Sequence, residues 1–125
     1  MNPKHECKKL INSFKYALQG FASSFRTERN MKIHVVATIL VIILGIYLKL
    51  NLIEWSIITI AIVIVISAEL FNTAIETIVD MVSPQKNEKA KLAKDISAGA
   101  VLILAIGSAI VGFIIFLPKI IAIFS

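Results

Sequence analysis

The sequence has few charged residues, few glycines and prolines, and a single cysteine. Of its 125 residues, 17% are charged, five are Gly, three are Pro and one is Cys. These numbers exclude a collagen-like chain, a disordered chain and a small disulfide-rich scaffold. Because Cys7 is alone, it cannot form an internal disulfide.

Several motifs of soluble enzymes are also absent. The chain has no phosphate-binding P-loop, no glycine-rich loop of the protein-kinase type and no GxSxG sequence. His5 and His34 have no partner at a spacing typical of a zinc site. Any chemistry of this chain must therefore come from another arrangement of residues.

Apolar residues dominate what remains. They make up 58% of the chain, whereas a soluble domain has about 45–50% apolar and about 25% charged residues. This excess indicates a membrane protein. On such a chain the net charge of +5 is more typical of membrane orientation than of nucleic-acid binding, so we expect no nucleic-acid partner.

Three apolar stretches are long enough to cross a bilayer, which requires about 20 helical residues. Asp95 and Lys119 enclose 23 residues without a charge. Two earlier charge-free runs are shorter and span only with their flanking residues. We predict an all-α, polytopic protein of one domain, 1–125, with transmembrane helices over 31–49, 53–82 and 96–118, the second extending into the cytoplasm.

The basic residues predict the orientation of these helices. Seven Lys and Arg lie in the chain up to Lys32, and four lie between Lys86 and Lys94, against Lys49 and Lys119 elsewhere. Since cytoplasmic segments carry the excess of basic residues, we expect the N-terminus on the cytoplasmic side. The C-terminus then lies outside, and the protein sits in the cell (inner) membrane.

Residues 5–26 form an amphipathic pattern. Apolar residues recur every three or four positions, as expected for a helix: Leu10, Phe14, Leu18, Phe21 and Phe25. Because the other positions carry basic residues, the pattern favours a helix on the inner membrane surface. The alternative is a helix that packs against the protein core.

A polar stripe interrupts the second span. Glu69, Asn72, Glu76 and Asp80 fall within roughly 80° of one another on a helix. With Trp55 at the outer membrane edge, Glu69, Glu76 and Asp80 lie about 21, 31 and 37 Å deep, respectively. Since the hydrocarbon core is about 30 Å thick, Glu69 lies within it and Glu76 at its boundary.

An ionisable residue within the bilayer indicates function, because it is costly to place there. Glu69 can act as a base, and Glu76 at the water boundary can hold Mg²⁺ with phosphate oxygens. Together they describe a site where a lipid hydroxyl meets a metal-bound phosphate. The alternatives are a hydrogen bond from Glu69 to a neighbouring helix and a solvated helix end at Glu76.

Basic and acidic residues on the cytoplasmic side are further candidates. Four lysines could hold phosphate oxygens, although membrane orientation also explains them: Lys86, Lys89, Lys91 and Lys94. Glu28 is either an ion-pair partner of Arg26 or Arg29, or a second metal ligand opposite Glu76.

The sequence resembles a family of small bacterial integral-membrane lipid kinases, the prokaryotic diacylglycerol kinases and the undecaprenol kinases of Gram-positive bacteria. The family signature E-x-x-N-[ST]-A-[IV]-E-x-x-[VI]-D is present from Glu69 to Asp80, and its later A-K-D is present at 93–95. The segments RTERN before His34, IEW at 53–55 and FLPK at 116–119 look like the undecaprenol kinase branch.

The resemblance implies roles for individual residues. Glu69 would be the catalytic base, Glu28 and Glu76 would bind Mg²⁺ with the ATP phosphates, and Asn72 would position the lipid hydroxyl or the γ-phosphate. The implied ATP-binding residues are Lys9, Tyr16, Glu28, Glu76, Lys86, Asn87, Lys94 and Asp95. The resemblance also implies a homotrimer in which the surface helix of one subunit completes the site of another.

One position departs from the family pattern. Asn87 stands where the family often has a His, which puts an adenine contact there in doubt and leaves Lys86 as a substitute.

We therefore expect an ATP-dependent lipid kinase that converts undecaprenol to undecaprenyl phosphate. The alternative substrate is diacylglycerol, with phosphatidic acid as product. More distant alternatives are a small proton-coupled transporter with Glu69 as its proton site and a non-enzymatic membrane scaffold.

Overall fold

A computed structural model describes residues 2–125 and consists of four helices. They are α1 (Pro3–Thr27), α2 (Arg29–Tyr47), α3 (Leu52–Val82) and α4 (Glu88–Phe124). Residues 2–125 contain no strand. The predicted all-α class is therefore confirmed, and α2, α3 and α4 are the three helices that are long and apolar enough to cross a membrane.

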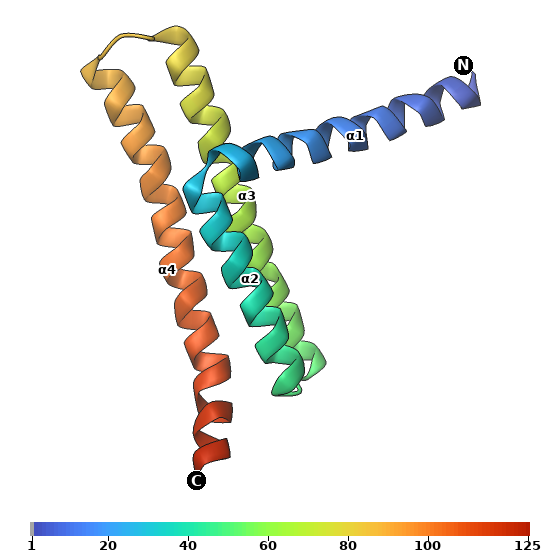
Figure 1. The fold of residues 1–125 in the computed structure, drawn as a ribbon, viewed down its shortest axis with the longest axis vertical. Helices are drawn as coiled ribbons and strands as arrows, with labels where there is room; N and C mark the ends of the chain where they lie inside the picture. Colours follow the sequence, from blue (N-terminus) through green and yellow to red (C-terminus); the bar gives the residue numbers. More distant parts are fainter. Residues whose placement is uncertain (1) are drawn as a thin grey trace.

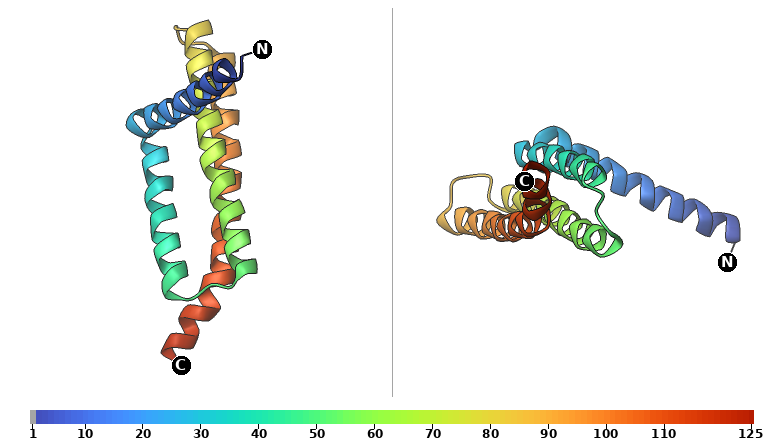
Figure 2. Two further views of the ribbon diagram at one scale, coloured as in Figure 1. Left: turned by 90° about the vertical axis from the view of Figure 1, so that its right-hand side faces the viewer. Right: turned by 90° about the horizontal axis from the view of Figure 1, so that it is seen from below.

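The three long helices form a bundle, and α1 leaves it as an arm. Figure 1 shows α2, α3 and α4 running lengthwise, with α1 projecting sideways from the start of α2. The right-hand view in Figure 2 shows the N-terminal end of α1 standing clear of the bundle. The most extensive helix packing is between α3 and α4. The helices α1, α2 and α3 meet at one end of the bundle. In the predicted orientation this is the cytoplasmic end.

The arm exposes its apolar face. Asn2 caps α1 by accepting a hydrogen bond from the Lys4 N–H at 3.1 Å, and Pro3 occupies the first helical turn, where its missing N–H costs nothing. Leu10, Phe14 and Leu18 are 61–69% exposed. Since no part of the described chain covers these side chains, they favour the membrane-surface interpretation of α1.

A tight turn reverses the chain between α2 and α3. Lys49 adopts φ of 56°, and the N–H of Leu50 donates to the carbonyl oxygen of Gly45 at 3.1 Å. This is the Schellman arrangement, which satisfies the last carbonyls of a helix. The side chains of Leu50 and Trp55 then pack directly against Gly45.

The next helix begins with a capping box. The Asn51 side chain accepts from the Glu54 N–H at 2.8 Å, and the Asn51 N–H donates to Glu54 Oε1 at 3.0 Å, so two backbone N–H groups are satisfied at once. Glu54 also forms an ion pair with Lys119 of α4 at 3.1 Å. These contacts hold α3 and α4 together at the outer end.

A small cluster of buried apolar residues lies at that end. It consists of Leu50, Ile58, Ile115 and Phe116, with partly buried neighbours such as Trp55, while other buried apolar residues, including the fully buried Met31, lie outside it. Most large apolar side chains of the three long helices are exposed. The exposed apolar surface of these helices is far larger than that of a soluble monomer. It is typical of a bundle that is surrounded by lipid.

We expect Gly45→Ala to destabilise the bundle. A Cβ at Gly45 lies 2.7 Å from Trp55 Cη2 and 3.0 Å from Leu50 Cδ1, and forcing these groups apart costs about 1–3 kcal/mol. Gly107→Ala is the control, because a Cβ there meets nothing within 4 Å. Thermal unfolding in detergent micelles measures both. Equal melting temperatures of the two variants would contradict the proposed packing at Gly45.

Candidate active site

The polar stripe of α3 becomes steadily more exposed toward the C-terminal end of the helix. Glu69 is 1% exposed and Asn72 is 5% exposed. Glu76 is half-buried, and the Asp80 side chain is 63% exposed. The order of burial agrees with the order of depth expected from the sequence, and it separates a buried pair from two side chains nearer water.

The buried pair lacks hydrogen-bond partners. In the part of the chain that the structure describes, both carboxylate oxygens of Glu69 and Oδ1 of Asn72 are buried without one. The Asn72 amide nitrogen donates to Glu76 Oε1 at 3.4 Å. Because an unpaired buried carboxylate is strongly unfavourable, these oxygens indicate a site for a ligand that brings hydrogen-bond donors or positive charge.

The nearest basic group to this carboxylate is on α2. Nε2 of His34 lies 3.8 Å from Oε2 of Glu69, which is longer than a hydrogen bond. From the sequence, His34 has no partner for a zinc site and follows a segment that looks like the undecaprenol kinase branch; its position opposite Glu69 was not predicted. The available signal was depth, since His34 lies near the beginning of α2 and Glu69 in the second half of α3, and these two helices run antiparallel.

An apolar groove leads away from His34 between α2, α3 and α4. Its volume is about 440 Å³. His34, Thr38 and Ser108 are its polar lining residues. Both hydroxyls already donate to backbone carbonyls, Thr38 to His34 at 2.7 Å and Ser108 to Ala61 at 3.4 Å. The groove therefore offers a hydrocarbon surface with one imidazole at the end nearest the beginning of α2.

The C-terminal end of the arm docks beside Glu69. Ser24 is 3% exposed, and its hydroxyl lies 3.1 Å from the hydroxyl of Thr73. Thr73 donates to the carbonyl oxygen of Glu69 at 3.0 Å, so Ser24 is the donor to Thr73. This chain of two hydrogen bonds fixes α1 to the turn of α3 that carries the buried carboxylate.

Glu28 lies at the junction of α1 and α2. Its N–H donates to the carbonyl oxygen of Ser24 at 2.8 Å, and its side chain forms no cap bond with α2. Among residues 2–125, no ion pair joins Glu28 to Arg26 or Arg29. The structure therefore does not contain the ion pair considered from the sequence, and the carboxylate remains available to a ligand.

The junction brings three carboxylates into one neighbourhood. Glu28 and Glu76 are the charged side chains whose fields act on the carboxylate of Glu69. No group of three His, Cys, Asp or Glu side chains within residues 2–125 is close enough to form a metal cage. Mg²⁺ usually takes one or two protein carboxylates and completes its shell with phosphates and water. The donor chemistry of Glu28 and Glu76 fits this type of site.

Two ion pairs lie where α3 ends and α4 begins. Lys94 pairs with Asp80 of the polar stripe at 2.5 Å, and Lys91 pairs with Asp95 at 2.6 Å. The charge of Lys94 also acts favourably on Glu76. Lys94 is thus close to the acidic stripe, although in this structure its ammonium is engaged by Asp80.

Other predicted site residues lie away from this cluster. Tyr16 and Lys9 are exposed residues of the arm, about 12 and 22 Å along its axis from Ser24. Lys86 is exposed in the connection between α3 and α4. Asn87 caps α4, because its side-chain oxygen accepts from the Lys89 N–H at 2.8 Å. A single chain therefore brings together the stripe, Glu28 and Lys94, but not the arm residues.

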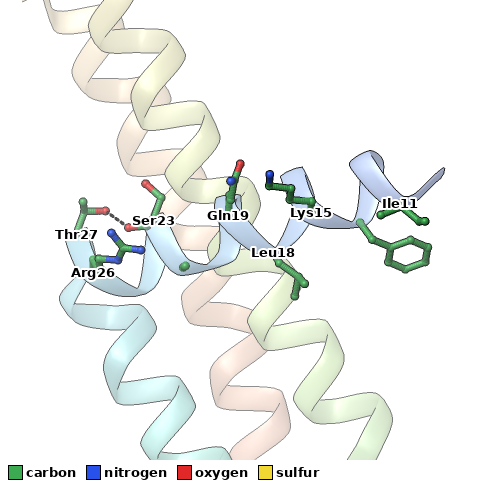
Figure 3. Close-up of a pocket in the computed structure, with 9 residues that line it drawn as sticks. Ile11, Lys15, Leu18, Gln19, Ser23, Arg26 and Thr27 are labelled. Atoms are coloured by element: carbon green, nitrogen blue, oxygen red, sulfur yellow. Dashed lines mark hydrogen bonds between the residues drawn. The ribbon is translucent and has the colours of Figure 1, made fainter. Parts of the chain in front are cut away.

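A second hollow of about 780 Å³ follows the arm itself. All of its lining residues belong to α1, and in Figure 3 Lys15, Gln19 and Ser23 point to one side of the helix while Leu18 points to the other. Because a single helix lines it, this hollow is an open amphipathic face. The burial and the unpaired oxygens at Glu69 are stronger indications of chemistry.

Comparisons with known proteins identify the family of this chain. Residues 15–116 match the family of prokaryotic diacylglycerol kinases. An undecaprenol kinase of Bacillus subtilis is 43% identical over 93% of this chain and 94% of that protein. A diacylglycerol kinase of Synechocystis is 40% identical over 90% of this chain and 65% of its own length. A diacylglycerol kinase of Haemophilus influenzae is 34% identical over 75% of this chain.

These similarities extend over the spans and the polar stripe. The matched residues 15–116 include Glu28, His34 and the whole stripe from Glu69 to Asp80. The predicted family and the predicted enzyme class, a lipid kinase, are both confirmed. The chain belongs to the prokaryotic diacylglycerol kinase family.

Proposed function

We propose that this protein transfers the γ-phosphoryl group of ATP to undecaprenol and forms undecaprenyl phosphate. The observation that carries the proposal is the buried carboxylate of Glu69, whose oxygens lack partners, beside an apolar groove between the three spanning helices. A lipid alcohol can bring a hydroxyl group to a carboxylate at this depth. The similarity to the Bacillus subtilis undecaprenol kinase supports the choice of lipid.

Glu69 acts as the general base. Its carboxylate accepts the proton of the lipid hydroxyl while the hydroxyl oxygen bonds to the γ-phosphorus. The bond between the γ-phosphorus and the oxygen that bridges to the β-phosphate breaks, and ADP leaves. Asn72 positions the hydroxyl or the γ-phosphate with its unpaired amide oxygen and its N–H groups. Since little covalent work falls to the protein, positioning supplies most of the rate.

The nucleotide occupies the cytoplasmic side of the stripe. Glu28 and Glu76 would hold Mg²⁺ with the ATP phosphates, and a metal held there would supply neutralisation of the phosphate charge. Lys94 and Asp95 contact the nucleotide, as do Lys86 and Asn87 in the preceding connection. Because Asp80 engages Lys94, the phosphates compete with that carboxylate for the ammonium group.

The arm completes the site of a neighbouring subunit. Lys9 and Tyr16 are too far along α1 to reach their own Glu69, and the N-terminal end of α1 stands clear of the bundle. We therefore propose a homotrimer in the inner membrane, with the N-terminus in the cytoplasm and the C-terminus outside. In this arrangement, Lys9 and Tyr16 bind the ATP of an adjacent subunit.

Phosphate transfer to two lipids tests the proposal. Purified protein in mixed micelles receives labelled ATP and Mg²⁺ with either undecaprenol or a diacylglycerol. We expect a strong preference for undecaprenol. Preference for diacylglycerol, the substrate named for the Synechocystis and Haemophilus relatives, would keep the chemistry and reject the lipid. Transfer to neither would reject the kinase proposal.

We expect Glu69→Gln to reduce turnover by about 10² to 10⁴-fold, the usual contribution of a general base, and to leave ATP binding intact. Isothermal titration with a non-hydrolysable ATP analogue measures the binding. Glu88→Gln, at the exposed first residue of α4, is the control and should keep full activity. Loss of nucleotide binding in Glu69→Gln with turnover preserved at saturating ATP would refute the base role.

Glu76→Gln should raise the Mg²⁺ concentration required for half-maximal rate, because the amide is a weaker ligand for a hard cation. A Mg²⁺ titration of the transfer rate at fixed ATP measures this shift, with Glu88→Gln again as the matched control. A titration curve identical to that of the unchanged protein would remove Glu76 from the metal site.

A further inference from the structure

His34 is the one side chain in the groove with polar atoms that no hydrogen bond in the described chain engages. Thr38 and Ser108, the other polar lining residues, both donate to backbone carbonyls. The remaining lining is aliphatic or aromatic. A molecule in the groove can therefore form a polar contact only at its cytoplasmic end, where the imidazole and the buried carboxylate of Glu69 face each other.

The separation of these two groups fits one hydroxyl group. Nε2 of His34 and Oε2 of Glu69 are 3.8 Å apart, too far for a direct hydrogen bond. An oxygen atom placed between them reaches both with hydrogen bonds of about 2.8 Å. Such a hydroxyl accepts a hydrogen bond from the N–H of His34 and donates one to Glu69. It thereby gives a partner to one of the unpaired carboxylate oxygens.

We infer that His34 positions the acceptor hydroxyl against Glu69 and, with the groove, selects an alcohol whose hydrocarbon chain begins directly at the hydroxyl-bearing carbon. This inference rests on the proposed function and deepens it. The chain follows the groove from Ala37 toward Leu117. His34 therefore contacts the lipid acceptor and not the nucleotide.

The lining explains the selectivity. A glycerolipid carries ester carbonyls next to its free hydroxyl, and these acceptors would enter a groove that has no free donor beyond His34. Leaving polar groups unpaired in an apolar site is unfavourable. The free-energy cost of the unpaired ester carbonyls therefore disfavours a glycerolipid in the groove, as a steric clash would. A polyprenyl alcohol carries no such groups and leaves nothing unpaired.

The kinetic test replaces His34. We expect His34→Leu to lower kcat/KM for undecaprenol about tenfold, equivalent to one hydrogen bond, with an unchanged KM for ATP. His34→Gln keeps an N–H donor and should recover part of the loss. His5→Leu, in the exposed beginning of α1, is the matched control with normal rates. Equal kcat/KM values for His34→Leu and the unchanged protein would overturn the inference. A rise in the KM for ATP as large as the loss in kcat/KM for undecaprenol would also overturn it.

A binding measurement separates this inference from the proposed function. In the ¹⁵N-His-labelled protein, farnesol should shift the imidazole resonances of His34, whereas farnesene, which has a similar hydrocarbon skeleton and no hydroxyl, should not. His5 serves as the internal reference. If the protein phosphorylates diacylglycerol alone, the proposed lipid and the selection by the groove both fail, whereas a shift with farnesol still supports the positioning of a hydroxyl group by His34. No shift with farnesol, or the same shift with farnesene, would refute the role of His34.

Discussion

The burial of one carboxylate without a partner is the constraint on which the rest of this site depends. Glu69 is 1% exposed, and neither of its oxygens has a hydrogen bond within the described chain. Such a group destabilises an apolar bundle, so its presence is best explained by a ligand that completes it. His34, which lines the groove, lies 3.8 Å from this carboxylate, and the rest of the acidic stripe follows Glu69 along α3.

The fold creates that environment at the junction of three helices. The arm docks through Ser24 and Thr73, so α1 covers the turn of α3 that carries Glu69. The groove approaches from the membrane, and the more exposed end of the stripe leads toward Asp80 and Lys94. A lipid and a nucleotide can therefore approach the same carboxylate from opposite directions, which phosphoryl transfer between a membrane alcohol and ATP requires.

Periodicity and composition predicted the three spans and the stripe, because both follow from helical geometry along one segment. Contacts between different helices could not be predicted in this way. The position of His34 opposite Glu69 and the pairing of Lys94 with Asp80 depend on how helices pack. The cap that the Asn87 side chain gives to α4 depends on where that helix begins, and the nucleotide contact expected of Asn87 stays a prediction. The distance of Lys9 from the cluster depends on the direction of the arm, which spacing alone does not specify.

The most direct test of the account locates the acceptor hydroxyl. Solid-state NMR of the protein in bilayers, with ¹³C-glutamate and a polyprenyl alcohol labelled at C1, measures carbon–carbon contacts between lipid and protein. The account predicts a contact between C1 of the alcohol and the side-chain carboxyl carbon of Glu69, and its loss in Glu69→Gln. The account would be contradicted if the bound alcohol is a substrate of the protein, yet its C1 contacts other glutamates and not Glu69.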